Sequence, residues 1–336
     1  MRNVTRSFKR AWIATVLIVT MMTLSACAAP KATEKEQQLD ELTVLLDWYP
    51  NAVHSFLFAA ESQGYFEEAG LHVKLQTPAD TNDAIKLVAA GKADLAISYQ
   101  MQVAISRGED IPIVSVAALV RHPLNQLFIL DDKKVERPMD LAELKIGYPS
   151  IPLYESFVKT MFAHDGGDPS QLTFVDIGWD LIPAMTTGRV DAIIGGYVNH
   201  EKLLLEKEDV KLKTFIPSEY GVPDYYELVL TASEKGIEQK GDVFKRFIEA
   251  ATRGFEYTME HPSEALQYLL DKQSDNFPLD AEIEQQSLAI LLPLMDAGTE
   301  AFGKQSEQSW QHAIDWLVEQ GQLKKDIEAK DAFRNL

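Results

Sequence analysis

The chain has 336 residues, of which 46% are hydrophobic and 25% are charged, and its formal net charge is -19 at pH 7. This composition is typical of a folded globular protein and differs from that of a disordered chain. The length allows two domains or one large bilobal domain. Because an acidic surface repels phosphate groups, the charge argues against nucleic acid as a partner and against a basic membrane-binding patch.

The first 26 residues have the pattern of an export signal. Four basic residues and no acidic residue occupy positions 2–10, and a mostly apolar stretch covers residues 11–24. This stretch is shorter than the roughly 20 apolar residues that a membrane-spanning helix needs. We therefore expect a signal peptide over residues 1–26 rather than a transmembrane helix.

Residues 24–27 read Leu-Ser-Ala-Cys, which is similar to a bacterial lipobox, where the cysteine is acylated and becomes the new N-terminus. Cys27 is the only cysteine of the chain, so it has no disulfide partner. The alternative is a free thiol that follows an ordinary signal peptide. We expect lipidation at Cys27 and a flexible tether over residues 27–40, which would hold the folded body at the extracytoplasmic face of the cell membrane.

From residue 42 onward, apolar strand-like runs alternate with helical segments. The expected strands cover residues 42–46, 71–75, 94–98 and 111–117, and the expected helices follow Asn51 and cover residues 81–90 and 100–107. The stretch from Asp47 to His54 joins the first strand to the first helix through Pro50. Alternation of this kind implies crossover connections and a largely parallel sheet.

The same pattern then begins again. A second set of expected strands covers residues 144–148, 172–175 and 191–195, with helices at residues 154–164 and 179–187 between them. Residues 90–97 and 187–194 share a sequence motif, in which a glycine ends a helix and an aspartate precedes a buried strand. A repeated motif at the same place in a repeated order predicts two α/β lobes of similar topology.

Two short extended runs, at residues 126–130 and 227–231, follow the two passes and are expected to join the lobes. After residue 231 the apolar residues keep helical spacing, and we expect these helices to pack on the first lobe. The expected lobes are residues 41–127 plus 232–336 for the first and 128–231 for the second. Two such lobes joined by two crossing strands favour a hinge-bending receptor that closes on a small molecule.

In sheets of this type, ligands bind at the carboxyl ends of the strands. Seven of the chain's 11 tyrosines lie in segments at these expected strand ends or in the return crossing. Aromatic rings would sandwich a flat ligand, and Asn and Glu would read its edge. The candidate ligand-binding residues are Trp48, Asn51, His54, Tyr99, Tyr154, Tyr197, Asn199, Glu201, Tyr220, Tyr225 and Glu227.

Structural roles remain open for several of these residues. Trp48 is also compatible with a core position and Asn51 with a helix cap alone. The helix dipole by itself favours a carboxylate at Glu201. Tyr225 and its neighbour Tyr226 point to opposite faces of an extended segment, so one of the two faces the cleft.

The sequence offers no clear metal or catalytic motif. The 7 histidines are scattered without metal-ligand spacing, no cysteine pair is present, and neither a phosphate-binding glycine loop nor a nucleophile elbow is found. We therefore expect no metal site, no catalytic residue and no cofactor.

Residues 42–270 resemble the periplasmic-binding-protein-like family that includes the fungal thiamine pyrimidine synthases and bacterial ABC-transporter proteins that bind pyrimidine precursors of thiamine. The discriminating motifs are D-W-Y-P-N-x-x-H at residues 47–54 and Y-G-V-P at residues 220–223. The matches at residues 64–66 and 91–94 are shared with sulfonate- and nitrate-type receptors. A further match, G-G-Y-V-N-H-E, covers residues 195–201. The candidate residues in these motifs carry over as ligand contacts by resemblance, whereas Tyr99 and Tyr154 rest only on the strand-end argument.

The resemblance implies a type II bilobal fold and a monomeric, lipid-anchored receptor for formylaminopyrimidine or a hydroxymethylpyrimidine-like ligand, with an ABC permease and its ATPase as partners. The fungal synthases use pyridoxal phosphate and carry a cysteine-rich motif, but this chain has no cysteine after Cys27. We therefore expect a receptor and not an enzyme. Two alternatives stay open at this point: a receptor for a sulfonate, nitrate or other oxoanion, for which Arg121 is the nearest basic residue, and a pyrimidine-forming enzyme.

Overall fold

The computed structural model describes residues 39–80 and 83–336. The expected signal peptide, Cys27 and all but the last residues of the expected tether lie outside the described residues. Within the described ranges, no helix is both long and apolar enough to cross a membrane.

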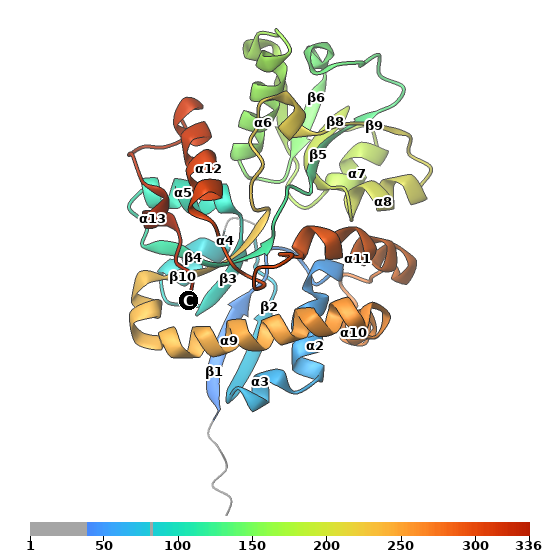
Figure 1. Cartoon of the computed structure of the whole chain (residues 1–336). Coiled ribbons are helices and arrows are strands. Elements are labelled where there is room, and N and C mark those ends of the chain that lie inside the picture. Colours follow the sequence, from blue (N-terminus) through green and yellow to red (C-terminus); the bar gives the residue numbers. More distant parts are fainter. Residues whose placement is uncertain (1–38, 81–82) are drawn as a thin grey trace, which may run out of the picture. The chain divides into compact units, whose positions relative to one another are not determined.

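The described chain contains two five-stranded sheets with the same arrangement (Figure 1). The strand orders are β2-β1-β3-β10-β4 in the first sheet and β7-β6-β8-β5-β9 in the second. In each sheet the first three strands are parallel, and the fourth strand runs antiparallel to both of its neighbours. The strands of the first sheet are Leu71–Gln76, Asp40–Leu45, Leu95–Ser98, Leu228–Ser233 and Ile113–Val120. Those of the second are Thr173–Asp176, Lys145–Tyr148, Ala192–Tyr197, Asn125–Leu130 and Leu212–Phe215.

The repeated glycine–aspartate motif has the same structural role in both lobes. Gly91 and Gly188 end α4 (Asp83–Ala89) and α7 (Leu181–Thr186) with φ angles of +66° and +69°, which glycine adopts without steric cost. The carboxylate of Asp94 accepts a hydrogen bond from the Thr43 backbone N–H at 2.9 Å. Asp191 in the second lobe accepts from the Lys145 N–H at the same distance. The prediction of two α/β lobes of similar topology is confirmed.

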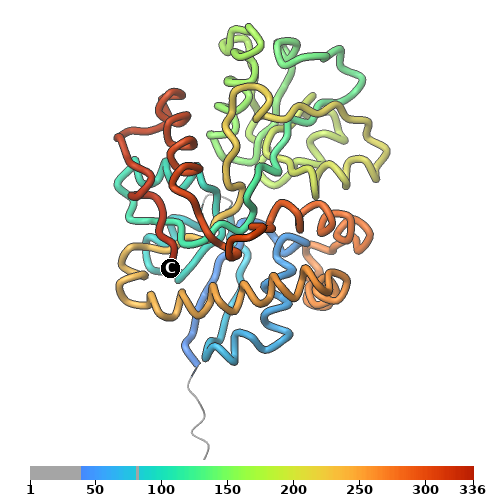
Figure 2. The backbone as a smooth tube through the Cα atoms, viewed as in Figure 1, coloured from blue at the N-terminus to red at the C-terminus, as the bar shows by residue number. Residues whose placement is uncertain are grey.

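The expected lobe boundaries need correction. The boundaries after residues 127 and 231 fall inside β5 and β10, yet β5 lies wholly in the second sheet and β10 wholly in the first. We therefore place the two connections between the lobes at residues 121–124 and 216–227. Figure 2 shows these connections side by side, and the Leu124 N–H donates a hydrogen bond to the Glu227 carboxylate at 2.8 Å.

Most helices belong to the first lobe, as expected for the C-terminal part of the chain. The long helix α9 lies along α2, and a Cβ at Gly254 would lie only 2.2 Å from a backbone oxygen of α2. The first-lobe helices are η1 Ala52–His54, α2 Ser55–Ser62, α3 Tyr65–Glu68, α4 Asp83–Ala89, α5 Gln100–Gly108, α9 Glu234–Glu260, α10 Pro262–Leu270, α11 Ala281–Met295, α12 Glu307–Glu319 and α13 Ala329–Ala332. The second lobe holds η2 Pro138–Leu141, α6 Leu153–His164, η3 Pro169–Gln171, α7 Leu181–Thr186, α8 Glu201–Lys207 and η4 Pro217–Tyr220.

Candidate functional site

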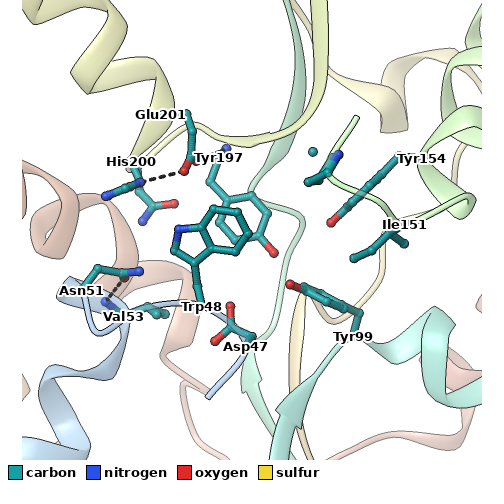
Figure 3. A pocket seen from close by; sticks show the side chains of 13 residues that line it. Asp47, Trp48, Asn51, Val53, Tyr99, Ile151, Tyr154, Tyr197, His200 and Glu201 are labelled. Carbon is teal, nitrogen blue, oxygen red and sulfur yellow. Dashed lines mark hydrogen bonds and ion pairs between the residues drawn. The ribbon is translucent and has the colours of Figure 1, made fainter. Parts of the chain in front are cut away.

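A pocket lies where the carboxyl ends of parallel strands from both sheets meet (Figure 3). The segments after β1 and β3 line it from the first lobe, and the segments after β6 and around the end of β8 line it from the second. The lining residues are Asp47, Trp48, Asn51, Val53, Tyr99, Pro149, Ile151, Tyr154, Gly195, Tyr197, Asn199, His200 and Glu201. The cavity measures about 30 Å³, which holds about two water molecules.

The turn after β1 is held by hydrogen bonds within its own sequence. Asn51 caps η1, because its side-chain oxygen accepts from the Val53 N–H at 3.1 Å while its amide donates to the Tyr49 carbonyl. The Asn51 N–H donates to Nδ1 of His54 at 3.2 Å, so Nε2 carries the proton and donates to Asp47 at 2.9 Å. His54 is fully buried, and it fixes Asp47 and Asn51 at the pocket from behind.

A buried acid–histidine cluster lies next to this turn, with the His200 ring against Tyr49. His200 lies 2.8 Å from Glu201 on α8 and 3.7 Å from Glu284 on α11, so it contacts carboxylates of both lobes. Burial lowers the pKa of His200, but the charge of Glu201 and the hydrogen bond to it outweigh this and raise the pKa overall. Burial conversely raises the pKa of Glu201, but the charge and hydrogen bond of His200, together with backbone N–H groups, lower it overall. The geometry and both directions describe a His200–Glu201 ion pair.

Glu284 and Ser287 on α11 extend this cluster to the first lobe. Glu284 accepts a hydrogen bond from the Ala52 N–H at 2.6 Å, and burial raises the pKa of its carboxyl group. Ser287 accepts a hydrogen bond from the side-chain amide of Asn199 at 3.0 Å. The Asn199 side-chain oxygen is buried without a protein partner, although Asn199 lines the pocket. It is therefore a free acceptor for a ligand N–H group.

Aromatic rings cover the side of the pocket around Trp48. The Trp48 ring is half-buried and lies 3.8 Å from the ring of Trp179, centroid to centroid, at an angle of 39°. Tyr49 stacks on the half-exposed ring of Phe277 at 4.9 Å. Because Trp48 comes from the first lobe and Trp179 from the second, a ring that displaces their contact would be held by both lobes.

Seven of the eleven candidate residues line the pocket: Trp48, Asn51, Tyr99, Tyr154, Tyr197, Asn199 and Glu201. Four do not. His54 is buried behind the turn, and Tyr225 and Glu227 are buried behind Tyr197, to which Glu227 is hydrogen-bonded. Tyr220 packs against His164 and Phe215 of the second lobe, because η4 and the turn at Gly221 (φ +88°) direct it away from the strand ends.

Two pocket residues, Asp47 and His200, and two residues that support the pocket, Glu284 and Ser287, are not among the candidates. Asp47 and His200 lie inside the motifs that the sequence singled out, next to residues that were chosen. Glu284 and Ser287 lie far away in sequence, on the buried stripe of α11. Polar residues on an otherwise apolar helix face were the signal that could have found them, since a buried polar group needs a partner. In the described part of the chain, no group of three or more His, Cys, Asp or Glu is placed to hold a metal ion.

Two α/β lobes with this strand order, and a pocket at the strand ends between them, form the bilobal type II fold of the periplasmic binding proteins. The alkanesulfonate-binding protein SsuA of Xanthomonas axonopodis pv. citri is similar, with a TM-score of 0.69 and 12% identity over 88% of this chain and 98% of that one. The nitrate-binding protein NrtA of Synechocystis PCC 6803 has a TM-score of 0.67 at 13% identity, over 88% and 86% of the two chains. At such identities the likeness shows the fold alone.

The family is more specific. The family described as "NMT1/THI5 like" matches residues 51–265, and the chain belongs to it. A formylaminopyrimidine-binding protein of Halalkalibacterium halodurans is 42% identical over 95% of this chain and 97% of its own length. A 4-amino-5-hydroxymethyl-2-methylpyrimidine phosphate synthase of Saccharomyces cerevisiae is 24% identical over 69% of this chain and 71% of its own. The resemblance stated from the motifs is confirmed.

Proposed function

We propose that this protein is an extracytoplasmic receptor of an ABC importer, which binds a thiamine-related aminopyrimidine and delivers it to the permease and its ATPase. The observation that carries this proposal is the 42% identity, over almost the whole of both chains, to a protein named for binding formylaminopyrimidine. The related synthases are more distant, at about a quarter of positions identical. A receptor role therefore fits the chain better than an enzymatic one.

The chemistry of the pocket supports a flat, donor-bearing ring. Trp48 offers a face for stacking from the first lobe. The carboxylate of Asp47 and the free oxygen of Asn199 accept hydrogen bonds, which suits the amino group of an aminopyrimidine. Asn51 uses part of its hydrogen-bonding capacity to cap η1, so it would contribute less to the ligand than its position in the motif suggests.

The structure disfavours an oxoanion ligand. Arg121, the basic residue considered for that role, donates to the Lys304 carbonyl at 2.6 Å and lies 3.3 Å from Glu300, and it does not line the pocket. The lining residues of the described pocket include Asp47 and Glu201 but neither Lys nor Arg. An anion would meet two carboxylates there, and the imidazole of His200 is already paired with Glu201.

The pocket also lacks the group that pyridoxal phosphate would need. This cofactor binds enzymes through a lysine Schiff base. No lysine is among the residues that line the described pocket. The residues that line this pocket therefore do not fit the cofactor of the fungal synthases.

Isothermal titration calorimetry with formylaminopyrimidine, hydroxymethylpyrimidine and thiamine tests the proposal. We expect saturable heat with at least one free aminopyrimidine and no heat with sulfate, nitrate or an alkanesulfonate under the same conditions. Heat with the oxoanions alone, or with no pyrimidine, would contradict it.

We also propose that Cys27 carries a lipid and that the receptor acts as a monomer anchored to the outer side of the cell membrane. Fractionation of cells that express the full chain tests the anchor: the wild type is expected with the membranes, and Cys27→Ser is expected in the soluble extracytoplasmic or secreted fraction. Retention of Cys27→Ser in the membranes would contradict the anchor without affecting the ligand proposal. Light scattering of the purified body would show a dimer if the monomer proposal is wrong.

A further inference from the structure

Three tyrosine hydroxyls meet at one end of the pocket. Tyr99 comes from the first lobe and Tyr154 and Tyr197 from the second, and Figure 3 shows their hydroxyl ends pointing toward one another. The hydroxyl ends of Tyr99 and Tyr154 lie beside that of Tyr197, near enough for Tyr197 to act on the pKa of both groups. A ligand at this end of the pocket therefore meets three neighbouring hydroxyl groups, one from the first lobe and two from the second.

The chain of hydroxyls ends at a buried carboxyl group outside the pocket. The Tyr197 hydroxyl donates to Oε1 of Glu227 at 3.1 Å, and Glu227 is 1% exposed. The other oxygen, Oε2, is approached by three donors: the backbone N–H groups of Leu124 and Asn125 at 2.8 and 3.1 Å and the Tyr225 hydroxyl at 3.2 Å. Glu227 thus links both connections between the lobes to the wall of the pocket.

The ionisation state of the Glu227 carboxyl group determines the direction of the hydrogen bonds among the tyrosine hydroxyls. An ionised carboxylate only accepts, so Tyr197 must donate to it. The Tyr197 oxygen is then free to accept from Tyr99 and Tyr154, whose lone pairs are left to face the pocket. In that state the tyrosine end of the pocket accepts hydrogen bonds from ligand N–H groups.

Protonation reverses the chain. Because backbone N–H groups donate to Oε2, the proton of the neutral acid resides on Oε1, the oxygen beside Tyr197. The acid then donates to the Tyr197 oxygen, and the Tyr197 hydroxyl turns toward Tyr99 or Tyr154. The hydroxyl that accepts this bond is left to donate its own hydrogen to the pocket, which then favours a ligand acceptor.

We propose that Glu227 is a positioning residue that sets ligand specificity, by fixing through Tyr197 whether the tyrosine end of the pocket accepts or donates hydrogen bonds. This inference rests on the proposed pyrimidine ligand, whose amino group is a donor. Burial raises the pKa of Glu227 to about 7, so both states of the chain are reached near neutral pH. The titratable groups that face this carboxyl or the hydroxyl chain are Tyr99, Tyr154, Tyr197, Tyr225, Asp47 and, through its charge on Tyr154, Glu201.

Calorimetry with two matched probes tests this inference. One probe is 4-amino-5-hydroxymethyl-2-methylpyrimidine, and the other carries a methoxy group, which only accepts, in place of the amino group. At about pH 8.5, above the pKa of Glu227, the wild type is expected to prefer the amino probe at least about tenfold, and the preference is expected to shrink at about pH 5.5.

Glu227→Gln imitates the protonated acid, because its oxygen is held by the two backbone N–H groups and its NH₂ group faces Tyr197. We expect this variant to lose the amino preference at both pH values. Tyr225→Phe is the matched control, since it removes a donor from Oε2 and leaves Oε1 and Tyr197 unchanged. It is expected to keep the amino preference at about pH 8.5, and the pH at which the preference shrinks is expected to move upward because this bond lowers the pKa of Glu227. A Glu227→Gln protein with the preference and pH profile of the wild type would overturn the inference.

Two further measurements test the inference if Glu227→Gln does not fold or if the wild type binds neither probe. If Glu227→Gln does not fold, Tyr197→Phe breaks the chain and leaves the backbone bonds of Glu227 intact; persistence of the wild-type pH profile in it would refute the inference. Infrared spectra of the ligand-free protein are expected to show a protonated carboxyl band that disappears as the pH rises through about 7, and Tyr197→Phe keeps the acid that produces it. If the wild type binds neither probe, the proposed function fails, and the absence of this band at every pH separately overturns the inference.

Discussion

Replacement of Trp48 by alanine should separate ligand binding from folding. Trp48 is half-buried, and its ring contacts are with Trp179 at 3.8 Å and Tyr49 at 5.7 Å between centroids. An aromatic pair contributes about 0.5–1.5 kcal/mol beyond the area it buries. We therefore expect Trp48→Ala to lower the free energy of unfolding of the ligand-free protein by about 1–2 kcal/mol.

A second tryptophan provides the matched control. Trp310 on α12 is fully buried and stacks on Phe333, so its replacement leaves a cavity in the core of the first lobe. Substitutions of this kind cost about 3–5 kcal/mol. Trp310→Ala is expected to destabilise the protein about two- to threefold more than Trp48→Ala, and to keep its ligand affinity under conditions where it remains folded.

The effect on binding should have the opposite order. An aromatic residue at the centre of a binding site typically contributes about 2–4 kcal/mol, which corresponds to a loss of affinity of about 30- to 1000-fold. Urea denaturation gives the free energies of unfolding, and calorimetry with formylaminopyrimidine gives the dissociation constants. A loss of stability in Trp48→Ala as large as that in Trp310→Ala, or an unchanged dissociation constant, would show that Trp48 is a structural core residue and not a ligand contact.

Three further predictions follow from the described contacts. The pKa of Glu227 is about 7 in the folded state and 4.5 in the unfolded state, so the folded state holds the proton more tightly. The unfolding free energy of the wild type, relative to that of Glu227→Gln, should therefore fall by up to about 3 kcal/mol between pH 4.5 and 7. Urea denaturation at several pH values measures this difference, and a difference that does not change with pH would contradict the buried acid. Asn199→Ala removes the free side-chain oxygen and should weaken pyrimidine binding about tenfold in calorimetry. Ser287→Ala removes only the hydrogen-bond partner of the Asn199 amide and should weaken binding less. Equal losses would show that Asn199 acts by its position and not through its free oxygen. Gly254→Ala should lower the free energy of unfolding by about 1–3 kcal/mol, because its Cβ would lie 2.2 Å from a backbone oxygen of α2. Gly241→Ala on the same helix meets nothing within 4 Å and should be neutral or stabilising by up to about 1 kcal/mol. Urea or thermal unfolding compares the two variants, and a larger loss in Gly241→Ala than in Gly254→Ala would refute the close packing of α9 on α2.

The sequence predicted most of the elements that position the site, because their signals are local. Apolar runs, several of them bounded by glycine or proline, predicted the parallel strands of both sheets, and the repeated motif around Asp94 and Asp191 indicated the second lobe. Strand β9 was missed, since Leu212–Phe215 is a short edge strand whose residues are all half-buried and show no clear alternation. The lobe boundaries were displaced because each antiparallel strand is inserted into a sheet built by distant segments, and strand pairing of this kind leaves no local signal.

The candidate site shows the same division between local and distant information. Residues at the ends of strands could be located from the sequence, and Trp48, Tyr99, Tyr197 and Glu201 do line the pocket. Whether a polar side chain faces the pocket or supports it from behind depends on contacts made by other segments. Glu227 drew attention in the sequence by its unusual position before an apolar strand. The backbone N–H groups of Leu124, in the first connection, and Asn125, the first residue of β5, hold its carboxylate outside the pocket.

The motif at residues 47–54 illustrates how a functional signal can report positioning. Its aspartate lines the pocket, whereas its histidine is fully buried and bonds both to that aspartate and to the backbone of Asn51. Asp47 and His54 are seven residues apart in sequence, and η1 folds the chain so that the His54 ring comes back to Asp47 at the end of β1. His54→Ala would remove a donor from a buried carboxylate and an acceptor from a buried N–H, so a loss of ligand affinity in this variant should come with a loss of stability of about 1–3 kcal/mol. Weakened binding at unchanged unfolding free energy would instead show that His54 contacts the ligand directly.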